Sequence, residues 1–417
     1  MSNISSSNGL EKYPELRFPG FDEPWKAIKL SDVGEASSGY GFPDAYQGEK
    51  TSEIPFFKVS DMNLSTNKRV MQHANNYVSQ STVEKLRVRP YSKDAIIFAK
   101  VGAAISHERK RIAISPFLID NNMMAFTPKR KEDIEFIYHL FQRLRLSKYI
   151  QVGALPSYNA NDILNICTFY PTSVIERKKI VNILNTIEER IDKQTEIITA
   201  LKKYKRGVLE AIFSRTLRLM PRASQSEWTA FKLSDFATRI TRKNNGATDI
   251  PLTISAQYGL IDQRDFFSKI VASTDMSGYY LLHRGEYAYN RSTSNDYPFG
   301  SIKRLDLYDK GAVSTLYLCF AIKEGVVLSD FVKWYFESSQ WYRGVNEICA
   351  EGARNHGLLN VPTDGFFNTV HILPSDIEEQ SRIAAFLSRI HEKVIQAQEE
   401  LDEMNSLRKG IMQQLFI

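Results

Sequence analysis

Apolar positions recur with a four-three alternation in two long stretches of the chain, and both stretches share one register. A spacing of 3.5 residues keeps one stripe of side chains on the same side of a helix, as in the seam of a coiled coil. We therefore predict two long helices, at residues 174–214 and 376–417, which pair through their seams. The seam residues are Ile180, Leu184, Ile187, Ile191, Ile198 and Leu201 in the first helix, and Ile383, Leu387, Ile390, Val394, Leu401 and Met404 in the second.

The two predicted helices have an alternative interpretation, in which each packs only on its own globular domain, as amphipathic surface helices commonly do. Shared register and length favour mutual pairing, and the cationic positions Lys205 and Arg408 also coincide within the two seams. We expect an antiparallel pair, because the first helix leads away from the first domain and the second has to return along it.

An internal repeat frames both predicted helices. The segment Trp25–Asp32 recurs as Trp228–Asp235, an offset of 203 residues (228 − 25), and Pro171 recurs with the same offset as Pro374. Between these anchors the similarity is weak and needs insertions and deletions. A common frame with different interiors indicates one scaffold that carries two different recognition surfaces.

These patterns predict a mixed α/β (or α+β) fold with a pseudo-two-fold internal repeat, in which two similar globular domains are separated by an antiparallel coiled coil. The predicted segments are a globular domain at 1–173, a helix at 174–214, a linker at 215–227, a second globular domain at 228–375 and a second helix at 376–417. Within the domains we expect strands at Ile54–Val59, Asp94–Lys100, Tyr287–Tyr289 and Val313–Ile322, and helices at Glu132–Leu146 and Ser329–Tyr342.

The composition sets limits on the class of protein. With 417 residues, 43% of them hydrophobic, the chain has material for two cores, and its net charge of +6 is only mildly basic. Its three cysteines are scattered and lack metal-type spacing, and no apolar run reaches a membrane-spanning length. The start of the chain is polar, unlike a signal peptide, so we expect a cytoplasmic protein.

The sequence carries no recognisable catalytic motif. It has no phosphate-binding glycine loop, no dinucleotide-type glycine signature, no paired CxxC and no HExxH. It also lacks the Asn-Pro-Pro-aromatic stretch with which amino-methyltransferases hold a base. We therefore predict no catalytic residue and no metal ligand.

Basic, amide and hydroxyl residues instead gather in polar loops at similar places in both halves of the chain. Arginine can span the two acceptors of guanine and asparagine can pair with adenine, while lysine and serine hold phosphates. Polar loops are more often only solvated turns, but their recurrence in both halves favours a DNA-binding role. The candidate DNA-binding residues are Lys100, His107, Arg109, Ser157, Tyr158 and Asn159, with Arg242, Asn290, Arg291, Arg354, Asn355 and His356.

The order of these features resembles the specificity subunit of type I restriction-modification systems, over nearly the whole chain. The first copy departs from the family pattern, with Arg177-Lys-Lys179 where a Glu-Gln pair is usual in the family. The resembling phrases are Leu16–Phe21 before Trp25 and Lys29–Asp32, Ile54–Asp61, Arg354–Asn360, and the closing run from Pro374 through Glu378–Ile383 to Phe416.

The resemblance implies two target-recognition domains that each read half of a split DNA site. It also implies two methyltransferase subunits that bind S-adenosylmethionine, and motor-nuclease subunits that bind ATP and Mg²⁺. Those cofactors would belong to the partners, and none is expected in this chain.

Other interpretations stay open at this point. The same architecture would serve a related system in which methylation and cleavage belong to one fused partner chain. A coiled-coil tether whose globular ends bind proteins is a second alternative, and DNA binding by the purified chain separates it from a DNA reader. A methyltransferase is disfavoured by the missing base-holding motif.

The missing motifs predict that this chain alone neither methylates nor cuts DNA. Highly purified protein, incubated with duplex DNA and a labelled methyl donor, should incorporate no label and leave the duplex intact. Reproducible incorporation or cleavage by this chain alone would contradict the prediction.

Overall fold

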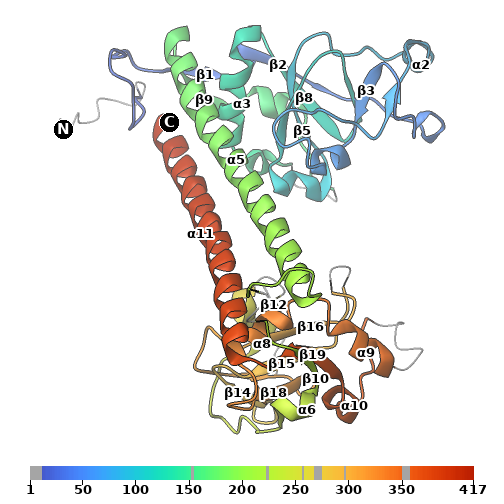
Figure 1. Cartoon of the computed structure of the whole chain (residues 1–417). Coiled ribbons are helices and arrows are strands. Elements are labelled where there is room, and N and C mark those ends of the chain that lie inside the picture. Colours follow the sequence, from blue (N-terminus) through green and yellow to red (C-terminus); the bar gives the residue numbers. More distant parts are fainter. Residues whose placement is uncertain are drawn as a thin grey trace. The chain divides into compact units, whose positions relative to one another are not determined.

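The computed structural model describes residues 12–151, 155–221, 225–255, 258–266, 275–294, 297–349 and 357–417. The chain forms two compact units, which we call unit 1 (Met1–Gln194 with Glu400–Ile417) and unit 2 (Thr195–Glu399). Two long helices, α5 (Val174–Phe213) and α11 (Ile377–Leu415), each contribute one part to either unit (Figure 1). Because the units divide both helices, they do not coincide with the segments proposed from the sequence, whose boundaries stay a prediction.

Unit 1 is a layered α/β structure around a four-stranded antiparallel sheet of order β2-β8-β5-β6. Alternate residues of the central strand β5 are buried on opposite faces of this sheet. Ile96 and Phe98 pack with α3, whereas Ala95 and Ile97 face the core shared with the β4-β3-β7 sheet. The elements are β1 (Lys26–Lys29), α1 (Leu30–Val33), β2 (Gly34–Ser38), β3 (Ile54–Phe57), β4 (Tyr77–Val78), α2 (Gln80–Leu86), β5 (Ala95–Ala99), β6 (Lys110–Ala113), β7 (Leu118–Ile119), β8 (Met123–Pro128), α3 (Ile134–Arg143), α4 (Ala160–Leu164) and β9 (Cys167–Tyr170), with short 3-10 turns at Asp44–Tyr46, Val59–Asn63, Gly102–His107, Lys131–Asp133 and Leu146–Tyr149.

Unit 2 repeats this arrangement with a different interior. Its four-stranded antiparallel sheet has the order β11-β18-β15-β16, and the central strand β15 again packs on a helix, α8, through Tyr287 and Tyr289. Ala288 faces the second core, between the sheet and the β14-β17 pair. The elements are β10 (Trp228–Lys232), α6 (Leu233–Phe236), β11 (Ala237–Ile240), β12 (Leu252–Ser255), β13 (Gly259–Asp262), α7 (Gln263–Phe266), β14 (Tyr280–His283), β15 (Tyr287–Asn290), β16 (Ser301–Arg304), β17 (Lys310–Val313), β18 (Leu318–Ile322), α8 (Ser329–Tyr335), α9 (Tyr342–Ile348), α10 (Thr363–Phe367) and β19 (Val370–Pro374).

The mixed helix-and-sheet class predicted from the sequence is confirmed, but two predicted elements were wrong in extent. The strand expected at Val313–Ile322 is split into β17 and β18 by a turn closed by Tyr317 N and Ser314 O. The helix expected at Ser329–Tyr342 is split into α8 and α9. Between these helices, Ser338 Oγ donates to Tyr335 O at 2.7 Å. The Trp341 indole donates to Phe336 O at 3.0 Å. These side chains take carbonyls that a continuing helix would use, so the helix ends.

The repeated frame is an antiparallel two-stranded ribbon at the base of each unit. In unit 1, β1 pairs with β9, and in unit 2 β10 pairs with β19 at the same repeat offset. The repeated Asp32 accepts a hydrogen bond from the Lys29 backbone at 2.8 Å, and Asp235 accepts one from Lys232 at 2.7 Å. The sequence repeat therefore reports one local structure that is built twice.

A buried glutamate joins each ribbon to the start of a long helix. In unit 1 the Trp25 indole donates to Glu176 Oε1 at 3.1 Å, and Arg17 pairs with the same carboxylate at 2.8 Å. In unit 2 the glutamate at the equivalent position of the repeat, Glu379, is the common acceptor of a larger group. Its donors are Trp228 Nε1 at 3.2 Å, Arg218 Nε and Nη2 at 3.0 Å each, and the backbone and hydroxyl of Ser226 at 3.1 and 2.5 Å.

Arg177 and Gln380 occupy the same position of the repeat, and the difference between them lies in the interior of the protein. Both side chains are buried, and both donate to the carbonyl of the repeated proline: Arg177 to Pro171 and Gln380 to Pro374, at 2.8 and 2.9 Å. Arg177 also pairs with buried Asp133 just before α3. Gln380 instead accepts a hydrogen bond from the backbone just before α8. Each residue thus fastens the long helix to the helix that covers the sheet of its unit.

The two long helices contact each other in antiparallel order within each unit. In unit 1 Glu188 meets Arg408 at 3.4 Å, and Gln194 donates to Glu400 at 2.9 Å. In unit 2 Lys205 lies 3.3 Å from His391. As the position along α5 rises, its partner's position along α11 falls, and the twelve predicted seam residues are all buried or half-buried. Ile180 and Leu184 share a core with Met412, Leu415 and Phe416, and Ile383 and Leu387 share one with Leu209, Ile212 and Phe213.

We predict that Glu379→Gln destabilises unit 2 locally by about 3–5 kcal/mol, because it removes the charge that pairs with Arg218 in a buried network. Hydrogen–deuterium exchange should quicken in β10 and around Ser226. The neighbouring Glu378 is a matched control, since it is exposed and, among the described residues, forms an ion pair only with Arg382 one turn away. Glu378→Gln should therefore cost about 0–1 kcal/mol. Equal exchange in both variants would contradict the role given to Glu379.

Candidate nucleic-acid interface

The first candidate residue, Lys100, directly follows the central strand of the unit 1 sheet. Its backbone N–H donates to Asn122 O at 2.9 Å, and its carbonyl accepts from Tyr158 N at 3.3 Å. Two residues later Gly102, which has a φ of +75°, donates to Pro156 O at 2.8 Å. The loop that precedes α4 is therefore bonded to the end of β5, and this brings two separate parts of the sequence together.

Arg291 occupies the equivalent place in unit 2. It directly follows β15, and its carbonyl accepts from Leu359 N at 3.0 Å. Two residues later Thr293 N donates to Gly357 O at 2.7 Å. Arg291 follows Lys100 by 191 residues (291 − 100), and Leu359 follows Tyr158 by 201 residues (359 − 158). Neither number equals the repeat offset of 203 residues (228 − 25). Simple repetition in the sequence therefore does not reveal that Lys100 and Arg291 correspond.

The side chains at this end of the unit 1 sheet form a cluster of donors, which we call the strand-end cluster: Ser38, Lys100, His107, Arg109 and Ser157. Lys100 Nζ donates to Ser38 Oγ at 2.9 Å, and Ser157 lies half-buried in the loop bonded to β5. His107 is exposed at the end of a 3-10 turn, and Arg109 donates to Asn63 just before β6. Sequence reasoning misses Ser38 and Asn63, because neither stands in a run of basic or amide residues.

The charge of the strand-end cluster is not cancelled by the neighbouring Glu108. Buried Lys110 contacts the Glu108 carboxylate at 2.5 Å, and Ser147 N donates to it at 2.8 Å. Burial opposes the charge of Glu108, but these hydrogen bonds outweigh it and lower the pKa of the carboxyl. Burial also lowers the pKa of Lys110. Lys110 therefore neutralises the charge of Glu108 inside unit 1. The positive charges of Arg109 and Lys100 remain uncompensated by Glu108.

Two of the predicted unit 1 residues have structural roles. Tyr158 is only 4% exposed, and its hydroxyl donates to the carbonyl of Ala99. Burial raises its pKa, and a side chain so placed offers no surface to DNA, so its assignment as a DNA-binding residue was wrong. Asn159 is exposed but caps α4, where its side-chain oxygen accepts from Asn161 N at 2.8 Å and from Asp162 N at 3.1 Å.

The predicted unit 2 residues are not all brought together. Arg291 is half-buried, and its guanidinium donates to the carbonyls of Leu316 and Val361 at 2.9 and 3.5 Å. Asn290 accepts from the Ser292 backbone at 3.0 Å. Arg242 pairs with Glu286 at 2.7 Å, before the start of β15 and so at the opposite end of that strand from Arg291. Arg354, Asn355 and His356 lie outside the described residues.

Two searches of the described part of the chain, for a metal site and for a membrane span, both gave a negative result. Within it, no group of three or more histidine, cysteine, aspartate or glutamate side chains is placed to hold a metal ion. A search of the same residues for a helix long and apolar enough to cross a membrane also finds none.

Comparison with known proteins agrees with this geometry. Residues 22–203 match the family model of the type I restriction modification DNA specificity domain. The specificity subunit of the type I restriction enzyme MjaIX from Methanocaldococcus jannaschii is 21% identical over 198 residues, which cover 47% of this chain and 45% of that protein. The matched segment therefore spans less than half the length of this curated relative. The resemblance inferred from the sequence is confirmed.

Solved structures extend the likeness to the whole chain. The S subunit of a type I restriction-modification system from M. genitalium aligns over 97% of this chain and 99% of its own, with a TM-score of 0.54 and 12% identity. A chain from a structure that addresses complex assembly and conformational transition of the type I R-M system aligns over 95% of this chain and 98% of its own, with a TM-score of 0.54 and 14% identity. At these identities the likeness shows the fold, and it includes both copies of the repeat.

We predict that alanine substitution at a base-contacting arginine costs roughly 1–3 kcal/mol of binding and relaxes one position of the DNA site. The variants are single alanine changes at Lys100, Arg109, Asn159, Arg291, Arg354 and His356, measured by duplex binding at fixed salt and by site selection from a random pool. Arg343→Ala is the control, because this exposed side chain forms an ion pair with Glu347 on its own helix and with no other described residue. Unchanged affinity and site preference in all six variants would show that the assignment is wrong.

Proposed function

We propose that this chain, whose residues 22–203 match the type I restriction modification DNA specificity domain, is the DNA sequence-specificity subunit of a type I restriction-modification complex. In this role it performs no reaction of its own. It binds double-stranded DNA and determines where its partner subunits act. The family match covers the first copy of the repeat, and the structural likeness of the whole chain supports the same role for the second.

The observation that carries this proposal is the equivalence of Lys100 and Arg291. Each is a basic residue at the end of the central strand of a four-stranded sheet, bonded to a loop from a distant part of the sequence. A rigid sheet that holds donors at its edge preorganises them for phosphates and base edges. Because the surroundings of the two residues differ, each globular domain would read a different half of a split, asymmetric site.

The long helices would set the distance between the two half-sites and dock the methyltransferase subunits. In this proposal residues 1–173 and 228–375 act as target-recognition domains, joined through the helices at 174–214 and 376–417 and the linker at 215–227. The antiparallel contacts of α5 and α11 in each unit support a paired arrangement. S-adenosylmethionine would be bound by the methyltransferase subunits, and ATP with Mg²⁺ by motor-nuclease subunits.

Binding to random duplex tests the proposal at its first step. A DNA reader should bind with an affinity whose logarithm falls linearly with the logarithm of salt concentration, because each neutralised phosphate releases counterions. Site selection should then return two short conserved sequences separated by an unread spacer. A chain that binds no duplex at low salt would instead be a protein tether.

Adding one heptad to both helices should widen the spacer and leave the half-sites unchanged. Seven residues add about 10 Å of helix, which is roughly three base pairs of DNA at 3.4 Å each. The insertions belong at facing positions beside Gln194 and Glu400, so that the register of the pair is kept. Site selection with wild type and the lengthened chain gives the two spacers.

A heptad inserted into α5 alone is the matched control for the lengthened chain. It has the same sequence as one of the two insertions but shifts α5 against α11, so it should lose specific binding instead of widening the spacer. A continuous site, or a spacer that stays the same after both insertions, would rule out the helices as a ruler.

A further inference from the structure

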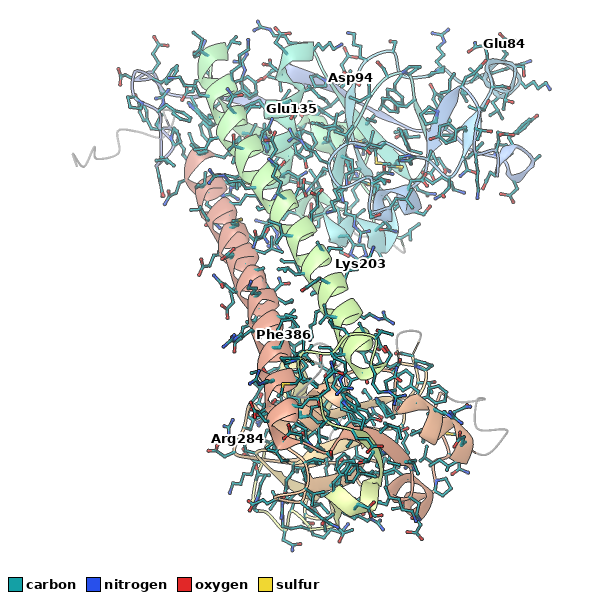
Figure 2. The ribbon with its side chains drawn as sticks, viewed as in Figure 1. Glu84, Asp94, Glu135, Lys203, Arg284 and Phe386 are labelled. Carbon is teal, nitrogen blue, oxygen red and sulfur yellow. The ribbon has the colours of Figure 1, made fainter. Side chains whose placement is uncertain are left out.

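A cleft of about 220 Å³ lies in unit 1, at the end of the four-stranded sheet away from the strand-end cluster. The start of β5, the end of β6 and the end of β8 meet here, and α3 begins beside them. Figure 2 labels Asp94, which stands directly before β5. The residues that matter to its chemistry are Lys93, Asp94, Ser115, Lys129, Lys131 and Ile134.

The cleft carries more positive charge than its own residues neutralise. Lys93, Lys129 and Lys131 are exposed side chains that line it, and none forms an ion pair with a described residue. Lys129 Nζ donates to the uncharged carbonyl of Ser31 at 2.9 Å. The single lining carboxylate, Asp94, already accepts from the backbone and hydroxyl of Ser115, at 2.9 and 3.1 Å.

In the equivalent corner of unit 2, two cationic side chains form ion pairs with carboxylates of the same unit. The correspondence is fixed by Lys323, which donates to Ser234 O at 2.6 Å as Lys129 does to Ser31, since Ser234 and Ser31 occupy the same position of the repeated segment. Arg304, which stands opposite the first residue of β15, pairs with Asp306 at 2.6 Å and with Asp330 at 2.8 Å.

A second cation in that corner, Lys333, is also paired, with Asp306 at 2.6 Å. The unit 2 corner thus supplies its own carboxylates for both of these cations. In unit 1 the residue opposite the first residue of β5 is the uncharged Ala113, and Lys93, Lys129 and Lys131 line the cleft beside it. The unit 1 corner is therefore complementary to an anion that the chain does not provide.

We propose that this cleft in unit 1 binds a phosphate group. Three lysines and the hydroxyl residues Ser92 and Ser115 line this space, and ammonium and hydroxyl groups are donors that hold phosphate oxygens. Ile134, the first residue of the ten-residue helix α3, lines the cleft, so that the positive end of the helix dipole adds to the attraction. The phosphate comes either from a DNA backbone outside the half-site read by the strand-end cluster or from a free phosphate compound. The binding of phosphate concerns unit 1 alone, and only the DNA source rests on the proposed function.

Lysine acetylation of the full chain, read by peptide mass spectrometry, tests the inference residue by residue. Inorganic phosphate at constant ionic strength should protect Lys93, Lys129 and Lys131 from acetylation, while an equal charge concentration of chloride should not. Lys323 is the internal control, because it makes the same contact in the corner without a free anion site. Equal reactivity of the cleft lysines with and without phosphate would overturn the proposal, as would equal protection of Lys323.

The double variant Lys93→Gln, Lys131→Gln extends the test, with the single change Lys323→Gln in the equivalent corner of unit 2 as the control. Phosphate binding, measured by calorimetry, should be lost in the double variant and kept in the control. Phosphate binding that persists in the double variant would overturn the proposal.

Binding to duplex DNA identifies the source of the phosphate. For a backbone phosphate the slope of the salt dependence should fall by about 0.9 in the double variant. An unchanged slope, with phosphate binding lost, identifies a free phosphate compound. Duplex binding that persists when phosphate protection is absent would refute the cleft and leave the DNA-reading function standing.

Discussion

The buried glutamates Glu176 and Glu379 are the contacts on which each unit depends. A carboxylate taken out of water is costly unless every lone pair is used, and both are surrounded by an indole N–H and a guanidinium. Each therefore joins three parts of the chain: the long helix, the first strand of the ribbon and the segment that leads into it. An apolar side chain at either position would leave the indole N–H and the guanidinium without their shared acceptor.

Positions that correspond in the two units solve the same packing problem with different chemistry. On α3, buried His139 meets Asn185 at 2.8 Å, and on α8 Trp334 donates to Ser388 at 3.1 Å. Burial lowers the pKa of His139 to about 4, so the ring is neutral at pH 7 and can be buried as an aromatic side chain is.

The contacts between the two long helices also use different side chains at equivalent positions of the two units. Glu188 faces Arg408 in unit 1, whereas at the equivalent positions of the repeat His391 faces Lys205 in unit 2. An ammonium group has no lone pair, so the neutral imidazole accepts the hydrogen bond. Burial, with Lys205 adding to it, lowers the pKa of His391 to about 4 and keeps the ring in that neutral form. What is repeated is therefore the geometry of the contact and not the pair of side chains.

This difference explains what could be predicted from the sequence. The frame was predictable because Trp25, Asp32 and Pro171 recur at one offset and make the same contacts in both units. The correspondence of Lys100 and Arg291 was not, because insertions change the offset and no shared residue type marks it. Tyr158 was misassigned for a related reason. A polar loop phrase in the sequence does not show which of its side chains turns inward, and here the ring fills the core beside Phe98.

A frame that is fixed by a few buried contacts leaves the strand ends free to vary. Lys100 and Arg291 are each held by backbone hydrogen bonds to a neighbouring loop, and such bonds do not depend on the identity of the side chain. Substitution at these positions can therefore change the surface without disturbing the sheet beneath it. Arg291 is partly an exception, since its guanidinium also holds the carbonyls of Leu316 and Val361. A change at Lys100 in unit 1 should therefore affect the recognition surface with little effect on stability, whereas a change at Arg291 in unit 2 affects both.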